Sequence, residues 1–335
     1  MKQQPQTPIS NRGFNAQFLC MVPRNNALEL DGIVASIDNV RIKYAYSKSG
    51  FDYEQRDRFD TLTRMLESLT ALSLWEERHF EIKCSREAGF KIGNYMRTIT
   101  YELPDGNSFA VLVGRYSYNS SVKMVEPEII MDINPNKIPP KIWHRIAWIL
   151  APTAQKISVQ RFDLAVDLPI CRDQLELQKR PGSGYQKFED KEGAVTEYTG
   201  ERSHHAAVKL YDKAADLGLD DLTCTRCEIT IDPAKFKGVA QLWPTILSHA
   251  PVELSMDFDA LPYEVKSVIL CPQLAPVLKA SVGRNTWAKY RKMIEAYGQT
   301  YFTLTDDQTS RIDRYVREQL MEYISVGTLL YETVQ

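Results

Sequence analysis

Carboxylates, cations and one tyrosine occupy alternate positions in three segments near the middle of the chain. The segments are residues 159–168, 207–213 and 225–231, and each alternates apolar and polar residues with a period of two. This pattern predicts strands that are buried on one face only. If the strands share a sheet, their polar face gathers the following side chains: Arg161, Asp163, Asp167, Lys209, Tyr211, Lys213, Arg226 and Glu228. Such a set suits metal-assisted attack on a phosphate.

Asp163, Asp167 and Glu228 are the candidate metal ligands. Carboxylates on the same side of neighbouring strands provide the hard oxygen donors that Mg²⁺ and Mn²⁺ prefer, so we expect Mg²⁺ or Mn²⁺ as the cofactor. Asp163 and Glu228 lead this set, because each lies in mid-strand beside an arginine, whereas Asp167 lies near a strand end. A solvated sheet face, on which charged residues are ordinary, is the alternative explanation of the same pattern.

Tyr211 is the candidate nucleophile, since a tyrosine hydroxyl can form a covalent phosphotyrosine that conserves the energy of a phosphodiester bond. The ordinary pKa of a phenol, about 10, must then be lowered by a metal or by cations such as Lys209 and Lys213. Packing of an aromatic side chain in a strand is the alternative role. Tyr185 and Tyr198 stay open as alternative nucleophiles.

Other kinds of site lack their motifs. His204 and His205 are adjacent, so an extended strand directs them to opposite faces. Many single-strand nicking enzymes hold a metal with two histidines separated by one residue, and such a site is therefore not expected here. The chain has no GxxxxGK[ST] loop and no GxGxxG segment that opens a helix, so ATP or dinucleotide chemistry is not expected. The Cys224–Cys227 segment lacks the second half of a zinc site.

The composition bounds the class of protein. The 335 residues are 44% hydrophobic and 25% charged, as in an average globular protein with a sizeable core. The net charge of −2 gives no global reason to expect a nucleic-acid partner. Six dispersed cysteines, with no secretory signal and no long apolar run, predict a cytoplasmic protein with reduced thiols and no membrane partner.

One local patch could still contact DNA. Between residues 279 and 292 five cations occur without an intervening acid: Lys279, Arg284, Lys289, Arg291 and Lys292. Trp287, Tyr290 and Ile294 follow helical spacing through the same stretch, which predicts a helix with its aromatic side inward and its cations outward. Such a basic face could lie on phosphates or in a groove of DNA.

The pattern along the whole chain predicts an α+β fold, with a largely antiparallel sheet or sheets and flanking helices, followed by a helical C-terminal region. The sequence predicts a disordered N-terminal segment at residues 1–26, an α+β catalytic region at residues 27–245 and a helical region at residues 246–335. The helical region could bind DNA or a partner. Late helices are expected at residues 239–248, 262–269, 286–297 and 309–324.

The order of the motifs resembles the replication initiation factor family, the rolling-circle replication initiators of plasmids and phages, with their relatives among conjugative relaxases that lack the two-histidine metal site. The similarity covers Val159–Ile231, with a weaker echo at Ile133–Lys137. Four segments carry it, in this order: Arg161–Asp167, Tyr198–Ser203, Lys209–Lys213 and Arg226–Glu228.

The resemblance implies an origin-specific, metal-dependent nickase and ligase. Tyr211 would join the 5′ phosphate and release a 3′ hydroxyl that primes synthesis, while Asp163 and Glu228 would hold the ion. Arg226 or Lys213 would stabilise the charged transition state. The further contacts to DNA would come from Lys209, Arg202, Arg284, Lys289, Arg291 and Lys292.

Implied partners are double- and single-stranded origin DNA, a host helicase and a second copy of the chain. Three alternatives stay open: a conjugative relaxase of the same chemistry, a non-catalytic DNA-binding protein, and a metal nuclease that uses water in place of tyrosine.

Overall fold

The computed structural model describes residues 27–30, 32–46, 53–68, 81–84, 95–103, 106–119, 122–179, 182–191, 193–202, 204–219, 223–248, 261–270, 274–298 and 300–326. The disordered N-terminal segment expected at residues 1–26 lies outside the described residues.

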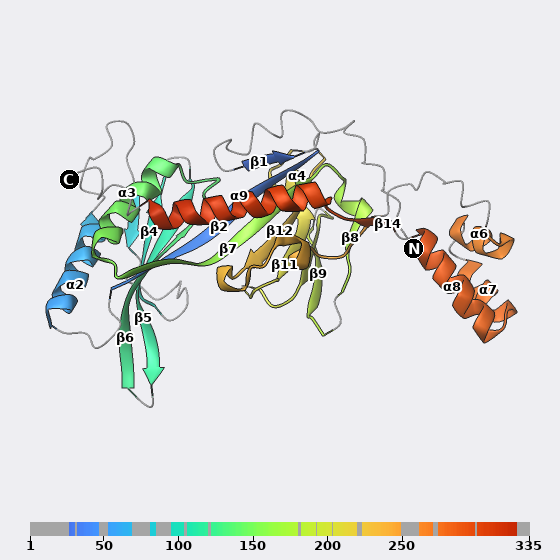
Figure 1. Ribbon diagram of the computed structural model, residues 1–335, viewed down its shortest axis with the longest axis horizontal. Helices are drawn as coiled ribbons and strands as arrows, with labels where there is room; N and C mark the ends of the chain where they lie inside the picture. The colour runs from blue at the N-terminus through green and yellow to red at the C-terminus, as the bar shows by residue number, and fades with distance from the viewer. Residues whose placement is uncertain are drawn as a thin grey trace.

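Eleven strands form one large antiparallel sheet, which confirms the predicted fold class (Figure 1). Its order is β3-β4-β5-β6-β2-β7-β12-β11-β10-β9, and β1 pairs with β2 at the side. The strands are β1 (Ala27–Leu30), β2 (Ile33–Ala45), β3 (Glu81–Cys84), β4 (Tyr95–Glu102), β5 (Ser108–Asn119), β6 (Val122–Ile133), β7 (Lys156–Leu168), β9 (Tyr185–Glu189), β10 (Val195–Thr199), β11 (Val208–Asp212) and β12 (Thr225–Ile231).

The three alternating segments are neighbours in this sheet, in the order β7-β12-β11. Their apolar side chains are buried on one face: Phe162, Leu164, Val166, Leu168, Val208, Leu210, Cys227, Ile229 and Ile231. Burial of one large apolar side chain stabilises a fold by about 1.5–3 kcal/mol, and a register slip of one residue would turn all of these side chains outward. The apolar face therefore fixes the register, and with it the arrangement of the polar face.

Helices cover the apolar face of the sheet. The longest, α9 (Asp306–Ser325), packs on β1, β2 and β7 and runs along the sheet in Figure 1. It begins with a capping box, in which Thr305 and Gln308 each bond the backbone N–H of the other. Ile312, Val316 and Tyr323 bury its inner side. The other helices on this body are α2 (Tyr53–Ser68), α3 (Pro140–Leu150), α4 (Lys213–Asp216) and α5 (Val239–Leu242), with short 3₁₀ turns at Ala151–Thr153, Arg172–Gln174 and Pro233–Lys235.

Two expected elements end earlier than predicted. The helix expected at 239–248 stops at Leu242, because Trp243 precedes Pro244 and a residue before proline disfavours the helical conformation. Residues Ile246–Ser248 instead form β13, which was wrongly predicted as helix. The second alternating segment, expected at residues 207–213, forms β11 and ends at Asp212, whose side chain caps α4, so Lys213 belongs to a helix.

The expected helical region at 246–335 comprises two parts in the structure. β13 pairs with β14 (Thr300–Phe302) and β8 (Leu175–Leu177) in a small second sheet, and α9 packs on the large sheet. Between β13 and β14 lie α6 (Tyr263–Leu270), α7 (Ala275–Ser281) and α8 (Arg284–Gly298), which pack on one another to one side of the sheet (Figure 1). None of the helices in the described ranges combines the length and the apolar character needed to span a membrane.

Candidate functional site

The polar faces of β7, β12 and β11 bring the predicted residues onto one surface. Glu228 lies opposite Lys209 on β11 and opposite Ala165 on β7, and Asp163 is two residues from Ala165, at the diagonal position on the same face. Tyr211 lies opposite Arg226. Side chains at directly opposite positions, and at the diagonal positions next to them, are close enough to interact across a sheet.

Tyr211 is hydrogen-bonded to Glu228. Its hydroxyl donates to Glu228 Oε1 at 2.7 Å, and the Lys209 ammonium lies 3.6 Å from the centroid of the ring. Tyr211 is only 6% exposed, and its neighbours include the charged side chains of Lys209, Arg226 and Glu228. Burial raises the pKa of the Tyr211 phenol, the charge of Glu228 raises that pKa further, and the charge of Arg226 partly opposes both. The phenol is therefore protonated near neutral pH, with its proton directed at a carboxylate.

Glu228 has the properties of a general base for that proton. Burial, and then the negative charge of Asp38, raise the pKa of the Glu228 carboxyl, while Lys209 and the bond from Tyr211 lower it. A carboxylate with a raised pKa is a stronger base, which improves its capacity to remove the phenolic proton. The second oxygen, Oε2, lies 3.8 Å from the Lys209 ammonium.

A cavity of about 190 Å³ opens beside Glu228, and Tyr211 lies behind Glu228, outside the residues that line it. Its lining includes both Asp163 and Glu228, together with the cations Arg161, Arg202 and Lys209 and with Tyr198, Ala207, Val208 and Thr230. The sequence pattern placed Arg161 on the polar face with Asp163 but assigned it no role, and the structure adds it to the cavity lining. These cations can neutralise a phosphate that enters the cavity.

Asp163 and Glu228 fit a divalent cation. Asp163 Oδ1 is buried and has no hydrogen-bond partner among the described residues. Burial raises the pKa of Asp163, against the opposing charge of Arg161. A cation would supply the missing partner, and Mg²⁺ binds through as few as one or two carboxylates when water and substrate phosphate complete its shell. No set of three or more His, Cys, Asp or Glu side chains converges as a metal site within the described ranges.

Asp167 is engaged elsewhere. Arg226 donates from Nε to Asp167 Oδ1 at 2.5 Å and from Nη2 to Oδ2 at 2.8 Å, and it donates from Nη1 to Asp38 Oδ1 at 3.2 Å. The carboxylate of Asp167 is thus saturated by a buried arginine and is not directed at the cavity. Asp38 was missed by the sequence analysis, because it lies at an irregularity of β2 where the register with β7 shifts between Ile37 and Asn39.

The weaker sequence echo upstream reaches the same cluster. Asn134 and Asn136 both donate from their side-chain amides to Asp38 Oδ1, at 3.3 and 3.4 Å. Asn136 also donates to Ser36 Oγ at 3.1 Å. The turn after β6 therefore fixes the carboxylate that in turn holds Arg226.

The two cations expected to stabilise the transition state are both paired with carboxylates. The Lys213 ammonium lies 2.6 Å from Asp216 Oδ2 and 5.7 Å from the centroid of the Tyr211 ring. Arg226 is 4% exposed and bound to two carboxylates. Their positions suit electrostatic support of Tyr211 and Glu228, whereas direct contact with a phosphate falls to the cations that line the cavity.

The alternative tyrosines lie on opposite faces of the sheet edge. Tyr198 lines the cavity, with the Arg202 guanidinium carbon 4.1 Å from its ring centroid and Phe188 packed edge-on at 5.8 Å. Tyr185 faces the other way and donates to Glu197. Of the two, Tyr198 alone reaches the cavity of Asp163 and Glu228.

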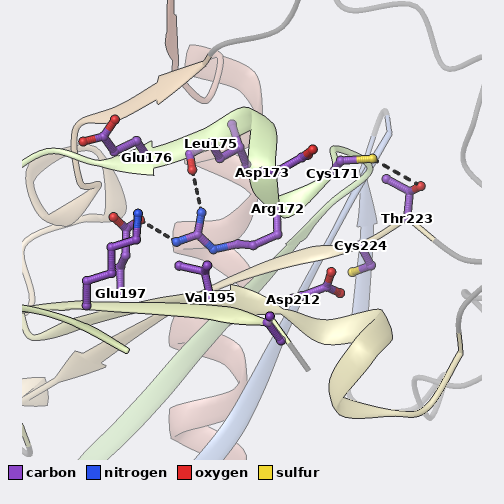
Figure 2. A pocket seen from close by; sticks show the side chains of 13 residues that line it. Cys171, Arg172, Asp173, Leu175, Glu176, Val195, Glu197, Asp212, Thr223 and Cys224 are labelled. Carbon is purple, nitrogen blue, oxygen red and sulfur yellow. Dashed lines mark hydrogen bonds and ion pairs between the residues drawn. The ribbon is translucent and has the colours of Figure 1, made fainter. Parts of the chain in front are cut away.

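A larger cavity of about 430 Å³ lies on the other face of β10 (Figure 2). Its centre is a buried ion pair in which Arg172 donates to Glu197 Oε2 at 2.5 Å and to the Leu175 carbonyl at 2.5 Å. Glu197 also accepts from the Leu177 backbone N–H at 3.0 Å. This network ties β8 to β10 and shares no lining residue with the smaller cavity.

The cations of the expected DNA-binding helix are far along the chain from this cavity. Arg284, Lys289, Arg291 and Lys292 all lie exposed on α8, within the unit of α6, α7 and α8. Lys209 and Arg202 are the two predicted DNA contacts that line the cavity itself.

Comparisons with known proteins add little to what the geometry of the site indicates about function. No family model matches the chain, and no curated protein matches it. One solved structure with similarity is described as a rolling circle replication initiator protein from Geobacillus stearothermophilus. The two have 12% sequence identity and a TM-score of 0.34, over 88% of this chain and 97% of that one.

Proposed function

We propose that the chain is a replication initiator that nicks one DNA strand at an origin and later rejoins it through a covalent phosphotyrosine at Tyr211. The observation that carries this proposal is the 2.7 Å bond from the Tyr211 hydroxyl to Glu228, beside a cavity lined with cations. The order of the sequence motifs supports the rolling-circle class. A conjugative relaxase would use the same residues.

The reaction exchanges one phosphodiester for another. Tyr211 Oη attacks the phosphorus, its proton passes to Glu228 Oε1, and the bond from phosphorus to the 3′ oxygen breaks. The 3′ oxygen takes up a proton from solvent and leaves as a hydroxyl, while the 5′ phosphate stays on the tyrosine. Attack by a 3′ hydroxyl on the phosphotyrosine reverses each step and reseals the strand.

The residues around the cavity hold the phosphate during this exchange. Arg161, Arg202 and Lys209 neutralise its charge, and Lys209 also stabilises the developing phenolate, since its ammonium lies over the Tyr211 ring. Asp163 and Glu228 would hold the Mg²⁺ or Mn²⁺ ion. When bound, that ion supplies Lewis-acid stabilisation of the phosphoryl oxygens.

An exposed aromatic cluster supports a single-stranded substrate. Phe188 is 49% exposed, packs edge-on against Tyr198, and lies 5.4 Å from the Arg202 guanidinium carbon. Rings and guanidinium planes of this kind stack on unpaired bases, which a closed duplex does not offer. A strand whose phosphate enters the cavity can place its neighbouring base on this cluster.

The test uses the full chain, Mn²⁺ or Mg²⁺, and single-stranded oligonucleotides that tile the DNA flanking its gene. We expect cleavage of one sequence and a protein–DNA adduct that survives denaturing gel electrophoresis. Tyr211→Phe should abolish the adduct, whereas the matched control Tyr198→Phe should retain it.

Each other outcome contradicts a part of the proposal. An adduct that persists in Tyr211→Phe and vanishes in Tyr198→Phe would transfer the nucleophile to Tyr198. Cleavage without any adduct would identify a nuclease that uses water. Absence of cleavage on every oligonucleotide and on a supercoiled plasmid with the same DNA would leave a non-catalytic DNA-binding protein.

A further inference from the structure

The unit of α6, α7 and α8 is inserted between two strands that pair with each other, β13 and β14. Ser248 of β13 and Thr300 of β14 are direct partners in the small sheet, so the chain leaves and returns at neighbouring points. An element whose two ends meet in this way can be added to a body without disturbing the core of that body. The position of the unit therefore suggests a task separate from the cavity on the large sheet.

The unit has its own small core. Val265 and Val268 of α6 and Leu278 of α7 are buried, and Trp287 and Ile294 of α8 are half-buried. The three helices pack on one another in every pairing. This packing fixes one side of α8 as the inner side.

α7 and α8 are joined by a tight turn. Only Val282 and Gly283 separate them, and the Trp287 N–H donates to the Gly283 carbonyl at 2.9 Å, so the first turn of α8 starts directly after the connection. Two helices joined by a short turn that contains glycine, with a third helix packed against them, make up the helix-turn-helix arrangement.

The outer side of α8 is polar, exposed and periodic. Arg284, Ala288 and Lys292 follow one another at intervals of four residues, and Asn285 and Lys289 form the adjacent row. All five are exposed. At 3.6 residues per turn these rows lie opposite the side that Trp287 and Ile294 turn inward.

This face combines the groups that read base edges. Arginine and lysine donate to guanine, asparagine bonds adenine at two atoms, and the methyl group of alanine contacts that of thymine. A helix also fits the width of the major groove of B-form DNA. In RNA duplexes that groove is too deep and narrow for side chains to read.

The local charge complements a phosphate backbone. Residues 261–294 contain a single acid, Glu264, although the whole chain carries a net charge of −2. The cations of this stretch are Lys266, Lys279, Arg284, Lys289, Arg291 and Lys292. Such a concentration of one sign within a nearly neutral protein is the electrostatic footprint of a nucleic-acid site.

We propose that α7 and α8 form a helix-turn-helix that places the outer face of α8 in the major groove of duplex DNA and reads its sequence there. Asn285 and Arg284 act as the main specificity-determining residues, and Lys289 and Lys292 hold the backbone or guanines beside them. That the duplex is the replication origin rests on the proposed function; the groove-reading face itself does not.

The experiment selects bound sequences from a random duplex library with the full-length Tyr211→Phe protein, which cannot form the proposed tyrosine adduct. Affinity for the selected duplex is then measured for variants, and circular dichroism confirms that each variant folds. We expect Asn285→Ala to weaken binding about tenfold and to relax preference at one A·T pair. Arg284→Ala should relax preference at a G·C pair or lower the salt dependence by about one unit of slope.

Lys237→Ala is the matched control, because Lys237 is an exposed cation outside the unit. Its affinity should equal that of the parent, and a loss as large as that of Asn285→Ala would overturn the proposal. A library that yields no preferred sequence, or equal affinity for single strands, would also overturn it. Asn285→Ala on the chain with an intact Tyr211 should retain its adduct on a single-stranded oligonucleotide. Failure of nicking and failure of groove reading are thus observed separately.

Discussion

Replacement of Asp163 by asparagine should stabilise the ion-free protein and weaken its response to a divalent ion. Asp163 Oδ1 is buried without a hydrogen-bond partner among the described residues, and Asp38 and Asp132 add like charges nearby. A buried acceptor left unsatisfied costs about 1–3 kcal/mol, and more when it is charged. An uncharged amide of the same shape removes the charge, so we expect the free energy of unfolding to rise by about 1–2 kcal/mol.

The ion should reverse this order. An ion at a hundred times its dissociation constant stabilises the folded chain by about 2.7 kcal/mol. The wild type should approach that gain with Mn²⁺ or Mg²⁺, because the ion provides the partner that Asp163 lacks, whereas Asp163→Asn should gain less than about half as much. Wild type would then be the more stable protein with the ion and the less stable protein without it.

Urea unfolding with chelator, and again with excess ion, measures both differences. Asp132→Asn is the matched control, since Arg41 donates to Asp132 Oδ2 at 2.7 Å and that carboxylate is already satisfied. The control should be no more stable than wild type in chelator and should keep the full response to the ion. An Asp163→Asn protein that is destabilised in chelator, or that responds to the ion as wild type does, would refute the reasoning.

The pH dependence of the ion-free protein follows from the same burial. Folding raises the pKa of Asp163 and of Glu228, so the folded chain binds more protons than the unfolded chain between the ordinary and the raised values. The free energy of unfolding must then fall as the pH rises through that window. Asp163→Asn should remove part of this fall, and saturating ion should suppress it in wild type.

Two further predictions concern the neighbours of the cavity. Asp167→Ala leaves the buried Arg226 without its main partner and should lower the free energy of unfolding by about 3–5 kcal/mol in urea titrations. The control Asp216→Ala removes a half-exposed partner of Lys213 and should change the free energy of unfolding by less than about 1 kcal/mol. Equal effects of the two substitutions would contradict the structural role of the buried pair. Phe188→Ala should weaken binding of single-stranded DNA by about 1–3 kcal/mol in anisotropy titrations and leave the thermal midpoint of unfolding unchanged. The control Phe188→Tyr should retain binding. A loss of stability together with affinity would indicate that Phe188 has a packing role.

Period-two alternation predicted the faces of the central strands but not the partners across them. Asp163 and Asp167 look alike in sequence, since both are on the polar face of β7. The register sets Asp167 opposite Arg226 and Asp163 opposite Thr230, so one carboxylate is saturated and the other keeps a buried free oxygen. Register depends on packing of the apolar face and on turns far along the chain, which local spacing does not contain.

Irregular and non-local features were the least predictable. Asp38 joins the cluster through a shift in the register of β2, and no periodic pattern signals such a shift. The helices α6 and α8 were both predicted, α8 from the helical spacing of its apolar residues. The sequence did not predict that these helices lie between two paired strands, because β13 and β14 have three residues each and lie far apart in the sequence.

The charge balance of the polar face distinguishes a site from a solvated surface. The carboxylates of Asp38, Asp163, Asp167 and Glu228 lie close together there, and on an exposed sheet each would be hydrated by water. Arg226 binds two of them, Asp38 and Asp167, and leaves Asp163 and Glu228 with raised pKa values in a lined cavity. Burial of Asp163 Oδ1 without a hydrogen-bond partner among the described residues costs free energy that a purely structural face has no reason to bear. The arrangement is therefore best explained by a ligand, an ion together with a phosphate, that Asp163 and Glu228 would bind.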